Sequence, residues 1–142
     1  MTNIAAASGL VQQARGLAAV LDAAYAAFEE LLSDLWDQVD PGEATFIPHL
    51  MAATCAANAR DAVLFAPSLP LRRHHPSPVP DPAPQEGNSE GADGALARLS
   101  LLLASRLTEA AACAPDHGDR AACHDAACYA WQIHDLLTAS SP

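Results

Sequence analysis

The sequence has no lysine and few aromatic residues. All seven basic residues are arginines, and with 17 acidic residues the formal net charge is −10. A chain this acidic has no electrostatic attraction for nucleic-acid phosphates or for anionic lipid headgroups. We therefore expect no direct binding of nucleic acid and no membrane association.

Valine and isoleucine are also scarce, whereas alanine is abundant, and this balance favours helix over strand. The first residues lack the basic region of a secretory signal peptide, and Gln12, Gln13 and Arg15 interrupt any apolar run of membrane length. We expect a cytoplasmic protein whose four cysteines are reduced. With 142 residues, the chain is long enough to form one helical domain over residues 1–142.

The strongest pattern in the sequence lies in its first forty residues. Apolar side chains recur there with alternating gaps of four and three, at Leu10, Ala14, Leu17, Leu21, Ala24, Phe28, Leu31 and Leu35. This spacing keeps one seam of an α-helix facing a partner. It predicts a helix over residues 3–39, which ends before Pro41 because proline cannot continue a helix.

Three further helices are predicted from apolar periodicity and capping signals. They cover residues 44–66, 94–113 and 116–139. Asp40, Asp93 and Asp116 are the expected N-caps of these helices. Pro48 lies inside the first of the three, and we expect a kink or a restart of the helix near residues 45–48. The sequence therefore predicts an all-α protein, a four-helix bundle.

A proline-rich connection, residues 67–93, joins the second and third predicted helices. Proline at every second position favours an extended chain, and we expect this segment to be poorly ordered. Its length leaves open whether the helices on either side are parallel or antiparallel.

The first predicted helix is longer than the others. At about 1.5 Å per residue it spans roughly 55 Å, whereas the later helices span about 30 to 36 Å. Either it breaks near Gly9 or Gly16, where glycine disfavours helix, or its end extends beyond the bundle and binds a second copy or another protein. We expect the second arrangement.

Candidate metal ligands are densest in the last predicted helix. His124 and Cys128 are four residues apart and share a face, and imidazole and thiolate both bind zinc. A four-ligand site would need His49 and Cys55 to reach the same side. There is no CxxC or HExxH motif. We therefore expect no cofactor, and a metal- or small-ligand-binding bundle with zinc is the alternative.

Two surfaces are candidates for binding another protein. Trp131 lies at the margin of the last predicted helix's apolar face, where it either anchors an interface or packs against the bundle. The first predicted helix carries acidic residues, namely Glu29, Glu30, Asp34 and Asp37. The leading interpretation is a small acidic protein of regulatory or adaptor type without catalysis. It would bind a protein partner or self-associate through its first or last helix.

Asn58 and Asp61 share a face of the second predicted helix. We expect them to be buried polar groups that hydrogen-bond between helices. A second alternative function is an enzyme with a pocket around these two side chains and His49.

Overall fold

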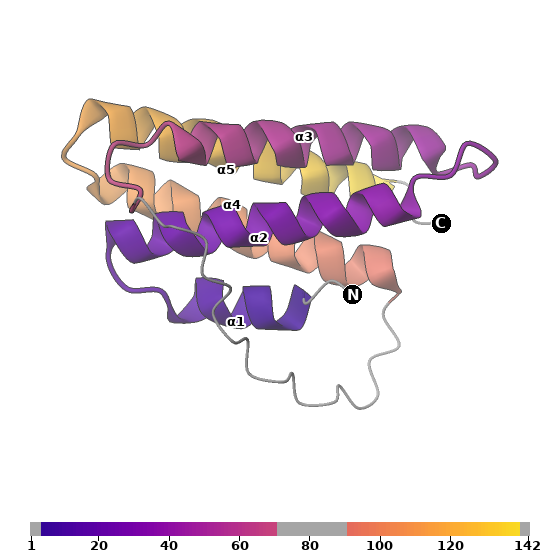
Figure 1. The fold of residues 1–142 in the computed structure, drawn as a ribbon, viewed down its shortest axis with the longest axis horizontal. Helices are drawn as coiled ribbons and strands as arrows, with labels where there is room; N and C mark the ends of the chain where they lie inside the picture. The colour runs from indigo at the N-terminus through magenta and orange to yellow at the C-terminus, as the bar shows by residue number, and fades with distance from the viewer. Residues whose placement is uncertain (1–3, 71–90, 140–142) are drawn as a thin grey trace.

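Figure 1 shows a computed structural model of the chain, which describes residues 4–70 and 91–139. All regular secondary structure in these residues is helical, which confirms the predicted all-α class. The helices are α1 (Ile4–Gln13), α2 (Leu17–Gln38), α3 (Phe46–Leu64), α4 (Ala92–Cys113) and α5 (His117–Ala139). The described residues thus form five helices, where the sequence predicted four.

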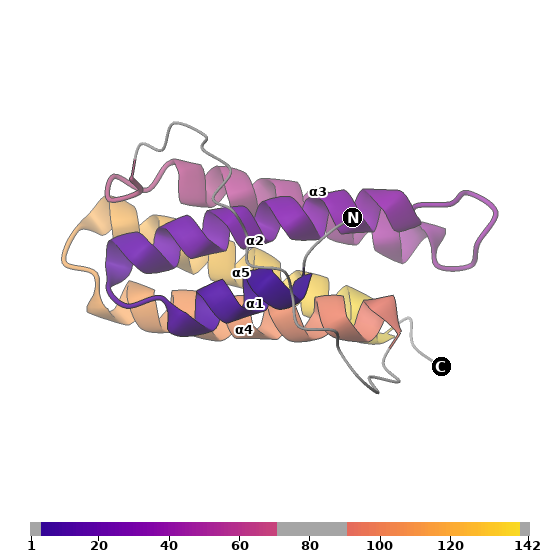
Figure 2. The same cartoon turned by 60° about the horizontal axis from the view of Figure 1, so that its bottom comes forward.

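The additional helix arises because the predicted first helix is interrupted at residues 14–16. Gly16 has a φ of +84°, a conformation that glycine adopts readily and that other residues rarely do. The chain reverses here, and α1 packs against α2 and α4 (Figure 2). The expectation that one long helix extends beyond the bundle is therefore wrong, because its first part folds back onto the rest.

The other four helices form an antiparallel bundle. Helix α2 packs on α3 and α4, and α5 packs on the same two helices. Helices α3 and α4 lie diagonally and run in the same direction, so the end of α3 and the beginning of α4 lie at opposite ends of the bundle (Figures 1 and 2). This settles the topology that the sequence left open. The connection predicted to be poorly ordered covers residues 67–93, of which residues 71–90 lie outside the described part. Its described ends differ from the prediction, because Ser68 hydrogen-bonds to Asp119 and α4 already begins at Ala92.

Helix α3 begins later than predicted. Asp40 is not its N-cap; the Asp40 carboxylate instead accepts a hydrogen bond of 2.9 Å from the amide of Gly42 in the preceding turn. Since α3 starts at Phe46, Pro48 is its third residue. An amide at that position has no partner within the helix, so proline removes no bond there. There is therefore no reason for a kink, and the helix instead starts within residues 45–48, which is the second of the two expected arrangements.

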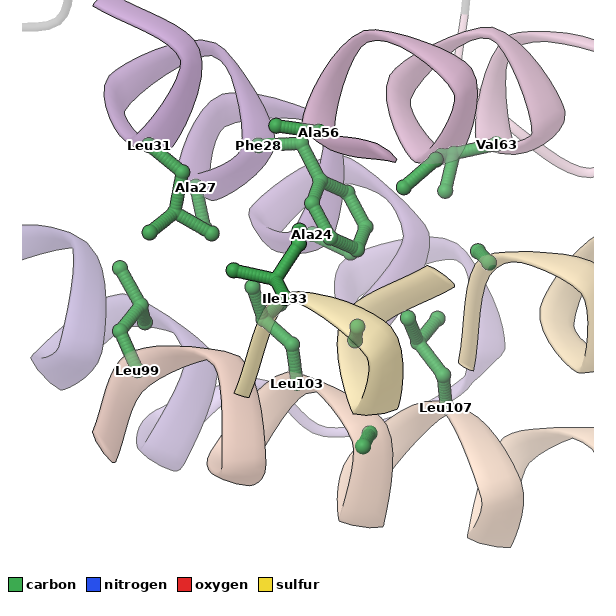
Figure 3. Close-up of a cluster of buried hydrophobic side chains, with 14 of the residues drawn as sticks. Ala24, Ala27, Phe28, Leu31, Ala56, Val63, Leu99, Leu103, Leu107 and Ile133 are labelled. Carbon is green, nitrogen blue, oxygen red and sulfur yellow. The ribbon is translucent and has the colours of Figure 1, made fainter. Parts of the chain in front are cut away.

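The core is asymmetric in side-chain size. Large residues come mainly from α2 and α4, where Phe28, Leu31, Leu103 and Leu107 are fully buried (Figure 3). The core faces of α3 and α5 consist mainly of alanine, namely Ala52, Ala53, Ala56, Ala59, Ala122, Ala126, Ala127 and Ala130. The distance between packed helices depends on the side chains at their contact, so α3 and α5 can approach closely. Longer side chains lie at the edge of this contact.

Among the described residues, no helix is both long enough and apolar enough to cross a membrane.

Candidate interaction surface

An open groove runs between α3 and α5 on the outside of the bundle. Its volume is about 480 Å³, and it is lined by Pro48, Met51, Cys55, Gln132, Asp135, Leu136 and Ala139. Met51 is 50% exposed, and Ile47, one turn earlier on α3, is 55% exposed. Apolar residues surround α3 almost completely, although only one of its faces reaches the core. In the described part of the chain, the groove and Ile47 therefore form an exposed apolar surface.

The polar groups of the groove are few, and they form no acid–base pair. The Cys55 thiol donates a weak hydrogen bond to Oε1 of Gln132 across the groove, with an S–O distance of 3.7 Å. Burial raises the pKa of the Cys55 thiol, which disfavours the thiolate that a nucleophile requires. Asp135 is exposed at the rim, and its Oδ1 lies 3.4 Å from Nδ1 of His134. The arrangement fits binding of apolar side chains with an acidic rim.

The four predicted metal ligands do not come together. His124 and Cys128 are exposed on α5, Cys55 is partly buried in the groove, and His49 is buried near the start of α3. In residues 4–70 and 91–139, no three His, Cys, Asp or Glu side chains are grouped so that they could hold a metal ion.

His49 instead connects two helices that lie diagonally in the bundle. Its Nε2 lies 3.0 and 3.2 Å from the two carboxylate oxygens of Asp93 on α4. His49 is 5% exposed, and its Nδ1 is buried without a hydrogen-bond partner. Asp93 was expected to cap α4, but α4 begins one residue earlier, and the Asp93 carboxylate bonds to His49. This pair joins the beginnings of α3 and α4.

The predicted Trp131 surface lies on α5. Trp131 is 44% exposed and meets the ring of His134 edge-on, with 6.1 Å between ring centroids. Its ring therefore packs partly on its own helix and partly faces outwards. Helix α5 lies diagonally opposite α2, so Trp131 and the acidic residues of α2 lie on helices at opposite corners of the bundle.

The four acidic residues of α2 that were predicted as a binding surface divide into two groups. Glu29 points towards α3, where its Oε2 lies 3.9 Å from Nη1 of Arg60. Burial and a hydrogen bond with Glu29 raise the pKa of neighbouring Tyr25. The second group shares another face of α2 by its spacing. It consists of Glu30, Asp34 and Asp37.

Asn58 and Asp61 are exposed, so the expectation that they are buried is wrong. They lie on the side of α3 away from the alanines that enter the core. Asp61 Oδ1 is 3.3 Å from Nη2 of Arg60, within the same helix. Neither Asn58 nor Asp61 lines the groove.

Two polar contacts with long sequence separation were not predicted. Asp119 is 1% exposed, and its carboxylate accepts hydrogen bonds from the Ser68 amide (2.8 Å) and the Ser68 hydroxyl (2.6 Å). Nη2 of Arg106 on α4 donates a hydrogen bond to the carbonyl of Ala14, just after α1. The position of Asp119 in the first turn of a helix could indicate a role at the helix terminus. No sequence signal indicates Ser68 or Ala14 as partners.

No protein-family model, curated protein or solved structure matches this chain.

Proposed function

We propose that this chain is a non-catalytic protein-interaction module of regulatory or adaptor type, which binds an amphipathic helix of another protein in the α3/α5 groove. The observation that carries the proposal is the groove itself, where Met51 and Leu136 line an apolar depression on the surface. Amphipathic helices bind in such grooves by apolar side chains repeated every three to four residues. A second copy of the chain is the alternative occupant of the groove.

The charge of the chain indicates the kind of partner. The charged residue of the groove is Asp135, which is acidic like most charged residues of the sequence. With a net charge of −10, the protein attracts basic partners at long range. We therefore propose a helix with an apolar face and flanking arginine or lysine. Nucleic acid and membrane lipid are not proposed as direct partners.

Crosslinking from inside the groove tests this proposal. A photoreactive amino acid is placed at Met51 in the full chain and, as a control, at Leu101. Leu101 is a 37% exposed leucine on α4, diagonally opposite α3. Crosslinking in cells is expected to give a defined protein adduct from position 51 and none from position 101. Equal adducts from both positions, or none from position 51, would overturn the proposal.

The affinity of the identified partner then provides a quantitative test. Met51→Glu places a second negative charge in the groove and is expected to weaken binding at least tenfold, which is about 1.4 kcal/mol. Leu101→Glu is expected to leave the affinity unchanged. Isothermal titration calorimetry measures both variants. Equal losses for both would mean that the partner does not bind in the groove.

A further inference from the structure

Helix α1 depends on the rest of the molecule for its position. It has ten residues, a length at which an isolated helix is marginal in water, and Gly9 lowers its helix propensity further. Its buried residues are Ala7 and Val11, whereas Leu10 is 53% exposed. The buried residues that α1 contributes to its contact with α2 and α4 are therefore small, Ile4 is only partly buried against the core, and Leu10 of the predicted seam lies outside.

Few interactions hold the break between α1 and α2. Gly16 is the one described residue with a positive φ. It is also the N-cap residue of α2, where it has no side chain that could bond to the first amides of the helix. Arg106 donates its hydrogen bond to the Ala14 carbonyl. In a continuous helix that carbonyl would accept the amide of residue 18 instead. The folded-back arrangement thus has one glycine and one side-chain hydrogen bond in place of a helical turn.

The sequence across the break is compatible with a continuous helix. The alternating seam runs through Leu10, Ala14 and Leu17 without interruption, and there is no proline before Pro41. A change of backbone torsions at residues 14–16 would join α1 and α2 into one straight helix. Helix α1 would then project about 15 Å beyond the end of the bundle. The face of α2 and α4 that α1 covers would be left without a partner.

We propose that α1 is an exchangeable segment, and that two copies of this chain form a dimer in which α1 of each copy packs on α2 and α4 of the other. When two straightened copies meet end to end around a two-fold axis, α1 of one copy runs antiparallel to α2 of the other. The same relation holds within the monomer (Figure 2). The α1 contacts are therefore kept, and the exposed Leu10 and the partly buried Leu17 can pack across the axis. Exchange of identical elements closes the assembly at two copies.

The decisive variant is Gly16→Ala in the full chain. Alanine disfavours the positive φ of the break and favours helix, so the monomer–dimer equilibrium is expected to shift about 10- to 100-fold towards the dimer. Gly16→Asn is the matched control, because asparagine tolerates a positive φ much better than alanine does, and it should keep the monomer–dimer equilibrium of the wild type. Light scattering over a concentration series measures both. A Gly16→Ala protein that is folded and monomeric at millimolar concentration overturns the proposal.

A second variant and a second measurement keep the proposal testable if the Gly16→Ala protein does not fold. Arg106→Gln removes the hydrogen bond to Ala14 without changing the hinge, and it is expected to raise the dimer fraction severalfold. In a mixture of two differently labelled copies, nuclear Overhauser effects from the Val11 methyl groups should reach α4 of the other copy. A dimer in which Val11 contacts only its own chain, or an Arg106→Gln protein that stays as monomeric as the wild type, contradicts the exchange of α1.

Discussion

The connections between α1 and α2 and between α4 and α5 have the same length and lie at the same end of the molecule (Figure 1), but they are held very differently. Residues 14–16 contain the glycine of positive φ and accept one hydrogen bond from a side chain, that of Arg106. Residues 114–116 contain Pro115 and Asp116, and Asp116 Oδ1 accepts hydrogen bonds of 2.8 and 3.1 Å from the first amides of α5. One connection is a hinge, and the other is a fixed turn.

Further contacts strengthen the second connection. Arg120 donates hydrogen bonds of 3.2 Å to the carbonyls of both Ala114 and Pro115. Gly118 lies so close to Pro67 that a Cβ there would be 2.9 Å from the proline ring. Two short connections can therefore encode opposite behaviour: several side-chain hydrogen bonds fix one turn, whereas a glycine with a single side-chain hydrogen bond leaves an alternative open in the other.

Removing the Asp119 carboxylate, which joins the start of α5 to Ser68 after α3, should have the largest effect. Its carboxylate is buried and accepts both hydrogen bonds from Ser68, and hydrogen bonds to charged groups contribute about 1.5 to 3 kcal/mol. Asp119→Ala is expected to lower the free energy of unfolding by roughly 2 to 3 kcal/mol. Urea denaturation, monitored by circular dichroism, measures this change in the free energy of unfolding.

Asp125→Ala is the matched control for this variant, because Asp125 is an exposed aspartate on the same helix. It should change the free energy of unfolding by less than about 0.5 kcal/mol. If Asp119→Ala were as mild as Asp125→Ala, the bonds to Ser68 would not stabilise the fold.

The same contrast explains how much of the fold could be predicted. The turn at Pro115 and Asp116 was predicted correctly, because proline excludes a continuing helix and aspartate caps the next one. The break at Gly16 was considered but not chosen. A glycine within an otherwise continuous apolar seam is compatible with both a straight and a broken helix, and only packing against α4 selects the break.

The candidate site was harder to predict than the fold. Cys55 and Leu136 reach one groove because α3 and α5 pack through alanine, and this proximity depends on the topology that the sequence left open. Asn58 and Asp61 were expected inside, since α3 is apolar almost all round and its core face cannot be chosen from periodicity. Ser68 and Asp119 are 51 residues apart, and their pairing has no local signal.

The Cys123 thiol should make the free energy of unfolding depend on pH, in part because of the charge of Asp119. Burial, together with the negative charge of Asp119 one turn earlier, raises the pKa of this thiol from 9.0 to about 11. The folded state then retains a proton that the unfolded state has lost. Stability is therefore complete below pH 9 and falls as the pH rises to 11, by on the order of 2 kcal/mol.

Denaturation at pH 8, 9.5 and 10.5 measures this loss. Cys123→Ala is expected to start from a lower stability, because it leaves a small cavity, but to lose less of it over the same range. Asp119→Ala should reduce the loss in part, since one of the two causes of the raised pKa disappears. If the wild type and Cys123→Ala lost the same stability over this pH range, the loss would come from groups other than Cys123.

Asp116→Ala should make the fixed turn resemble the hinge. Its effect on the free energy of unfolding should be smaller than that of Asp119→Ala or of the titration of Cys123. It removes the hydrogen bonds to the amides of Gly118 and Asp119, and losing an N-cap costs about 1 kcal/mol. Unlike Gly16→Ala, this variant is expected to remain a monomer by light scattering, because Pro115 forbids a straight helix from α4 into α5. A dimer would show that loss of a cap is enough to open a connection, and that the glycine of positive φ is not what distinguishes the hinge.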